Sequence, residues 1–124
     1  MDKLRDANFV ANLLGGVFIV VAILGFVPNP LVGPNGIFMT NAVHNIVHAL
    51  LGIVLLAGAK TGNAQKMLLI VGVIYLVVAI LGYFTPGNML LGMVMVNPAD
   101  HYLHLLLAVV LLGASQYVGG AKKK

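Results

Sequence analysis

The chain has 124 residues, of which 60% are hydrophobic and only 8% are charged, and it contains no cysteine. A soluble domain carries about 25% charged residues, so this composition predicts an integral membrane protein without disulfides or thiolate metal sites. The net charge of +4 does not indicate nucleic-acid binding, because the basic residues form no face with interleaved aromatic residues.

Four apolar runs are long enough to cross a bilayer, which takes about 20 residues in a helix. They lie at Phe9–Val27, Ala42–Ala59, Met67–Phe84 and Ala99–Val118. Backbone N–H and C=O groups in lipid must bond within their own segment, so each run is expected to be a helix. The predicted fold is therefore an all-α integral membrane protein, a four-transmembrane-helix bundle.

The charges predict how these helices are oriented. The Lys and Arg residues lie in the two tails and the middle loop, and none lies in the loops Pro28–Thr40 and Thr85–Val96. By the positive-inside rule, both termini are expected to be cytoplasmic, in a bacterial inner membrane. The two uncharged outer loops are apolar and too short to span. We expect each to form a short interfacial helix or to fold onto the mouth of the bundle.

The two halves of the chain repeat each other. The hexapeptide Val20–Gly25 recurs letter for letter at Val77–Gly82, so the first run is expected to be a permanent helix rather than a cleaved leader. We predict one membrane domain, 1–124, with a first two-helix repeat at 9–59, a second at 67–118 and a basic tail at 119–124. Both repeats run in the same sense, which implies a pseudo-two-fold axis along the membrane normal.

Two polar segments, Asn41–His48 and Asn97–His104, open the second and fourth runs. They contain all the histidines and the only acid outside the N-terminal tail. The repeat places His48 and His104 at equal depth and facing each other if they point inward, and it places His44 opposite Asp100. Each segment begins with an asparagine that can cap its helix. Asp100 is at the third helical position, where capping alone explains a carboxylate.

These segments offer a candidate metal site. His44 and His48 share one helical face, as do Asp100 and His104, so the two helices together present three imidazoles and one carboxylate. Such a set suits zinc or another divalent metal with nitrogen and oxygen ligands. The alternative cofactor is haem, with His48 and His104 as axial ligands. Gly52 and Ala108, one turn below, either make room for a macrocycle or let helices pack closely.

The pattern Asn41-x-x-His44-Asn45-x-x-His48, followed by Asn97-x-x-Asp100-x-x-x-His104, resembles the bacterial membrane family catalogued as domain of unknown function 4383. The resemblance covers essentially the whole chain. It implies the four-helix architecture and no settled activity. It also implies a recurring polar set, which here comprises Asn41, His44, Asn45, His48, Asn97, Asp100 and His104. His101 departs from the pattern, since an asparagine is expected there, so any role for His101 is local to this protein.

We expect a non-enzymatic structural or accessory membrane protein, in which the His/Asp cluster links the second and fourth helices. The sequence contains no nucleophile–base pair, phosphate loop or pair of hydrolytic acids. The competing hypothesis is a metal- or haem-binding protein that uses His48 and His104, assisted by His44 and Asp100. Proton or ion conduction is a third alternative, which the uncharged outer loops disfavour. The expected partners are the lipid bilayer and another membrane protein or a second copy of the chain.

Overall fold

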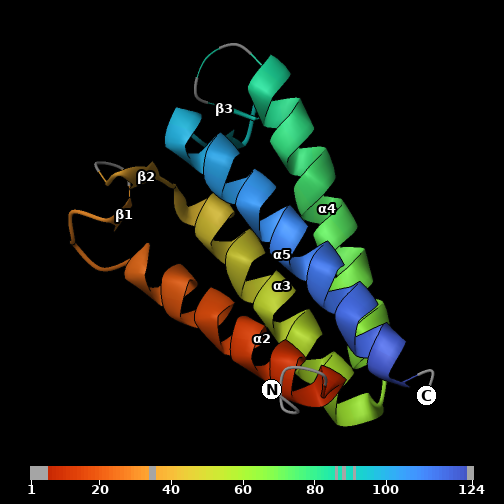
Figure 1. The fold of residues 1–124 in the computed structure, drawn as a ribbon. Coiled ribbons are helices and arrows are strands. Elements are labelled where there is room, and N and C mark those ends of the chain that lie inside the picture. The colour runs from red at the N-terminus through yellow and green to blue at the C-terminus, as the bar shows by residue number, and fades with distance from the viewer. Residues whose placement is uncertain (1–5, 34–35, 86, 88, 91, 123–124) are drawn as a thin grey trace.

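Four long helices run side by side and form the whole body of the molecule (Figure 1). The computed structural model describes residues 6–33, 36–85, 87, 89–90 and 92–122, with side chains as far as Tyr117. Within this part of the chain the helices are α2 (Ala7–Leu24), α3 (Ala42–Thr61), α4 (Ala64–Phe84) and α5 (Pro98–Lys122). Each contains a stretch long and apolar enough to cross a membrane. The predicted all-α membrane bundle is confirmed.

Several helix ends differ from the prediction by one to four residues: α2 begins at Ala7, α3 ends at Thr61, α4 begins at Ala64 and α5 begins at Pro98. Helix α2 ends at Leu24 rather than Val27, because the side-chain amide of Asn29 donates to the carbonyl oxygens of Leu24 and Val27 and holds the chain in a turn. Pro28, just beyond, cannot continue a helix. Helix α5 continues past Val118 as far as Lys122. At the same end of the bundle, Gly62 takes a φ of 77°, a left-handed conformation that suits glycine, and so ends α3 before α4 begins.

The loops that join α2 to α3 and α4 to α5 lie together at one end of the bundle, which we call the loop end (Figure 1). Each contains a pair of two-residue strands. Strands β1 (Val32–Gly33) and β2 (Phe38–Met39) pair in parallel, and β3 (Met89–Leu90) and β4 (Val94–Met95) pair antiparallel. We expected either a short interfacial helix or a segment folded onto the mouth of the bundle, and the structure shows the folded segment. No interfacial helix is present in their described residues.

Each loop is held by the capping asparagine of the other hairpin. The amide of Asn41 donates to the carbonyl oxygen of Met93 at 3.0 Å, and the amide of Asn97 donates to that of Ile37 at 2.9 Å. The two bonds are related by the sequence repeat, because both residues of each bond shift by the same interval. The two hairpins thus hold each other's loops in the same way, although the strand pair is parallel in the first loop and antiparallel in the second.

The two helices of each hairpin pack most extensively against each other. Glycines allow α2 and α3 to approach closely: a Cβ on Gly15 would come within 2.9 Å of the Gly52 carbonyl oxygen, and one on Gly52 within 2.8 Å of the Gly15 oxygen. Gly52 thus serves helix packing, one of its two predicted uses. Phe18 lies on the loop-end side of this contact, against His48, and the core on the other side contains Leu55, Leu68, Val71 and Leu111. Most other aliphatic side chains face outward.

Candidate functional site

Three histidines meet inside the bundle near its loop end. His44 and His48 come from α3 and His104 from α5, and one ring nitrogen from each lies within 4.8 Å of the others. All three side chains are buried. The ring centroids of His48 and His104 are 6.1 Å apart, those of His44 and His104 5.4 Å, and those of His44 and His48 4.9 Å. His48 and His104 therefore face each other, as the repeat predicted.

The starts of the two helices position these rings. On α3, the Asn41 side chain accepts from the His44 N–H at 3.0 Å, and His48 follows one turn later on the same face. On α5, Asn97 accepts from the Asp100 N–H at 3.0 Å, and the Asp100 carboxylate accepts from the Asn97 N–H at 3.0 Å. This reciprocal pair is the predicted capping box, and it fixes the turn that carries His104.

Asp100 is buried with its carboxylate engaged at the start of α5, and it does not belong to the three-histidine group. It also does not bond to His44, the residue that the repeat places opposite it. Instead, His44 Nδ1 contacts the carbonyl oxygen of Met95 at 2.7 Å, while the Asp100 carboxylate interacts with the backbone of Met39. His44 thus contacts the loop of the second hairpin and Asp100 that of the first. Like the bonds of Asn41 and Asn97, these two contacts are related by the sequence repeat.

The hydrogen-bond partners assign the positions of the ring protons. The Met95 oxygen can only accept, so His44 carries its proton on Nδ1 and its Nε2 is an acceptor. His48 Nε2, 3.1 Å from His44 Nε2, must then donate, and His48 Nδ1 accepts from the Tyr75 hydroxyl at 3.1 Å. When both imidazoles are neutral, these hydrogen bonds all donate in one direction, from Tyr75 through His48 and His44 to the Met95 carbonyl.

Tyr75 and Phe18 belong to this site, although we did not predict them from the sequence. Tyr75 on α4 is buried, with its ring centroid 5.9 Å from that of His48 and 5.5 Å from that of His104. Phe18 on α2 packs edge-on against His48 at 6.1 Å. One signal was available: the interval that aligns the two identical hexapeptides also aligns Phe18 with Tyr75.

One buried ring nitrogen of this cluster is left without a hydrogen-bond partner. Within the described part of the chain, His104 Nδ1 is buried and has no partner. Buried polar atoms are nearly always bonded, so an unbonded one needs an explanation, such as an unseen ion or water. His101 lies outside the cluster, with its ring against Gly82 of α4, so the structure separates it from the other three histidines.

Comparison with known proteins yields one match. The family model described as "Domain of unknown function (DUF4383)" matches residues 33–116, which include both polar segments and all the histidines. No curated protein and no solved structure matches the chain.

Proposed function

The chain belongs to the DUF4383 family, whose description assigns no function, and we propose from the site geometry that it is a membrane protein that binds one divalent transition-metal ion. The ligands are His44, His48 and His104. The single observation that carries the proposal is the convergence of three buried imidazole nitrogens, from two helices, to within 4.8 Å. Ionisable residues are costly inside a membrane, and each one there is a functional-site hypothesis by default.

The distances suit a small ion. In tetrahedral coordination with Zn–N bonds of about 2.0–2.1 Å, two ligand nitrogens lie about 3.4 Å apart. His44 Nε2 and His48 Nε2 are 3.1 Å apart, close to that value. The widest of the three separations would close by at most about 1.4 Å, from 4.8 Å to the coordination distance. Three histidine ligands leave a fourth position open, as in catalytic zinc sites.

The surrounding groups support this ligand set. The bond from His44 Nδ1 to the Met95 carbonyl orients the ring and leaves Nε2 free to bind a metal, as outer-sphere partners of metal-binding histidines do. His48 would be a ligand through Nε2 in the tautomer that carries its proton on Nδ1, and the Tyr75 oxygen would then accept a hydrogen bond from that N–H. Asp100, one turn before His104 on the same helix, is engaged in the capping of α5 and does not join the ligands.

The geometry favours an ion over haem. A macrocycle between His48 and His104 would have to displace the Tyr75 ring, whose centroid lies within 5.9 Å of both. The His44 ring, 5.4 Å from that of His104, limits the same space. The space beside Gly52, which could have accommodated part of a macrocycle, is occupied by the Gly15 backbone of α2.

The second candidate function is a structural or accessory one, without a bound ion. It is favoured by the continuous chain of bonds from Tyr75 to Met95, which ties α4, α3 and the β3–β4 loop together. Intramembrane hydrogen bonds of this kind stabilise helix contacts by about 0.6 kcal/mol each. The unpartnered His104 Nδ1 is not explained by this alternative.

Metal loading separates the two candidates. The protein purified in mild detergent is equilibrated with Zn²⁺, freed of excess ion and assayed for metal, beside His104→Ala and the matched control His101→Ala. We expect one ion per chain, retained in His101→Ala and lost in His104→Ala. Loading with Co²⁺ should give the visible absorption of a tetrahedral site. A protein that retains no metal supports the structural function, and a Soret band in the purified protein supports haem.

A further inference from the structure

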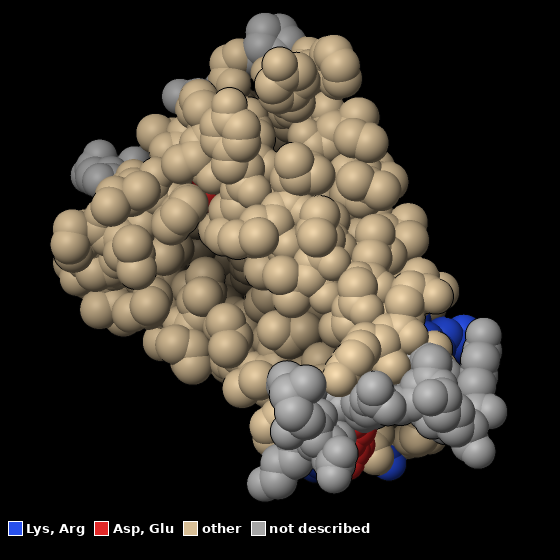
Figure 2. Space-filling model, in the orientation of Figure 1, with Lys and Arg blue, Asp and Glu red and all other residues tan. Residues whose placement is uncertain are grey.

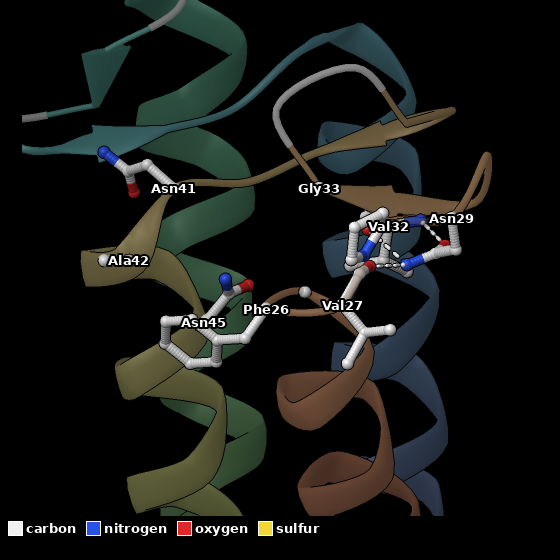
Figure 3. Close-up of a pocket in the computed structure, with 10 residues that line it drawn as sticks. Phe26, Val27, Asn29, Val32, Gly33, Asn41, Ala42 and Asn45 are labelled. Atoms are coloured by element: carbon white, nitrogen blue, oxygen red, sulfur yellow. Dashed lines mark hydrogen bonds between the residues drawn. The ribbon is translucent and has the colours of Figure 1, made fainter.

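Two hollows lie at the loop end, one in each hairpin, at positions related by the repeat. The first has a volume of about 480 Å³, and Figure 3 shows it between the end of α2 and the start of α3. The second has a volume of about 320 Å³ and lies between α4 and α5. The repeat aligns Gly25 with Gly82 and Asn45 with His101, and both pairs line their respective hollows.

Three asparagines line the first hollow, Asn29, Asn41 and Asn45, and the last of them is not fully hydrogen-bonded. Asn45 is 2% exposed, and its Oδ1 has no hydrogen-bond partner among the described residues. Figure 3 shows its amide turned from α3 toward the end of α2. A Cβ on Gly25 would overlap this amide, so the glycine makes the space in which it lies. Because the two ends of an Asn amide exchange by a simple flip, Asn45 can offer a ligand either a donor or an acceptor.

The start of α3 adds a second polar group. The first N–H groups of a helix have no partner within it, and the Asn41 side chain satisfies only that of His44. Ala42, the first helical residue, lines the hollow. The first turn of α3 contains no acidic residue, so the positive end of its dipole is not neutralised there. Such a helix start favours an anion, and phosphate groups in particular.

The second hollow also contains a buried polar atom without a partner among the described residues, His101 Nδ1, but the helix start beside it differs. The helix that begins at the second hollow is α5. Its first residue, Pro98, has no N–H to donate, and Asp100 lies in its first turn. A carboxylate at that place disfavours a second anion. A helix start with a free N–H group and no acidic residue is therefore found only at the hollow of the first hairpin.

The position of the first hollow indicates where its ligand comes from. The span α2 has 18 residues and ends at Leu24, a length of about 27 Å that nearly matches the hydrocarbon core of a bilayer. The hollow follows directly, so it lies at the depth of the lipid headgroups. Its rim includes Phe26 and Val27, which are 58% and 50% exposed, and these side chains offer an apolar surface to acyl chains.

We propose that this hollow binds the phosphodiester headgroup of a membrane phospholipid. The phosphate oxygens accept from the Ala42 N–H and the Asn45 amide, and the acyl chains lie along Phe26 and Val27. The volume of about 480 Å³ is within the usual range of ligand pockets. None of the three clustered histidines lines the hollow, so this proposal does not depend on the metal site.

Native mass spectrometry of the whole protein in detergent tests the proposal. The protein is titrated with phosphatidylethanolamine and, separately, with an uncharged galactosyl diacylglycerol that carries the same acyl chains. We expect the phospholipid to bind more tightly. Ala42→Pro, which removes one N–H and copies Pro98, and Asn45→Leu should each weaken phospholipid binding about tenfold, the effect of one lost hydrogen bond to a charged group. His101→Leu, the matched change in the second hollow, should have no effect.

Folding is checked by far-UV circular dichroism. Ala42→Pro is compatible with the backbone, because proline suits the first helical position and the preceding Asn41 is extended, with φ −124° and ψ −177°. Equal binding of the two lipids would overturn the proposal, as would unchanged phospholipid binding by both folded variants. Displacement of the lipid by inorganic phosphate would assign the site to a free anion and overturn the lipid assignment.

Discussion

The Tyr75 hydroxyl on α4 donates a hydrogen bond to His48 Nδ1 on α3 across 3.1 Å, with both groups buried inside the membrane span. This bond joins the two hairpins, because α3 belongs to the first and α4 to the second. The Met95 carbonyl, which can only accept, sets the proton positions on His44 and His48, and the Tyr75 hydroxyl donates to the His48 nitrogen that is left without a proton.

Replacement of Tyr75 by Phe keeps the ring and removes only this donor. We expect the helix bundle to lose about 0.6 to 1.7 kcal/mol of stability, the range for a hydrogen bond between membrane helices. We expect Zn²⁺ affinity to fall about 10- to 100-fold, because metal-bound His48 loses the acceptor of its Nδ1 proton. Unfolding in mixed micelles and a competitive Zn²⁺ titration measure the two effects. Unchanged metal affinity would argue against a role for Tyr75 at the site.

Removal of the metal should lower the thermal stability of the wild-type protein but not that of His104→Ala. A ligand that binds only the folded state stabilises it by about 2.7 kcal/mol when present at a hundred times its dissociation constant. Thermal unfolding in detergent, with Zn²⁺ or with excess chelator, measures the difference. A chelator effect of the same size in His104→Ala would place the responsible ion elsewhere.

Acidification should release the metal. An imidazole binds a metal only in its neutral form, so protons compete with the ion at each of the three histidines. The affinity is therefore expected to fall as the pH decreases, by up to about three powers of ten per pH unit where all three rings take up a proton. Zn²⁺ titrations between neutral and acidic pH measure the slope. An affinity that does not fall even where the metal-free rings take up protons would exclude an all-histidine ligand set.

The contact between Gly15 and Gly52 predicts a strong effect of a single methyl group. Gly15→Ala would place a Cβ 2.9 Å from the Gly52 carbonyl oxygen, so α2 and α3 must separate. We expect a loss of about 1 to 3 kcal/mol, typical of overpacking. The neighbouring Gly16→Ala is the matched control, because its Cβ would meet nothing within 4 Å. Unfolding in mixed micelles compares them, and equal stabilities would contradict the observed packing.

The membrane orientation proposed from the charges is cytoplasmic termini in a bacterial inner membrane. In Figure 2 the Lys and Arg side chains in view gather at the end of the bundle that carries the termini, which supports it. The chain has no native cysteine, so single cysteines can report topology. A membrane-impermeant maleimide applied to spheroplasts should label Ile37→Cys, and Lys60→Cys only after permeabilisation. The reverse pattern would invert the orientation.

Much of this protein could be predicted from spacing alone. The four spans follow from apolar runs, because a bilayer leaves the backbone little choice but a helix. The capping box of Asn97 and Asp100 follows from the residue types at a helix start, and it is found as expected. The placement of His48 opposite His104 follows from the repeat. Each of these inferences needs only distances along the chain, which an α-helix converts directly into positions.

Only the tertiary structure decided which side chains reach the histidines. Helical spacing gives the face on which a residue lies, but the separation of two faces depends on contacts such as Gly15 against Gly52. That packing brought Tyr75 and Phe18 into the cluster. The packing also explains why His44 bonds to the Met95 carbonyl and not to Asp100: each loop folds across onto the opposite hairpin. The sequence thus determined the helices and their polar faces, and packing between the hairpins determined the site.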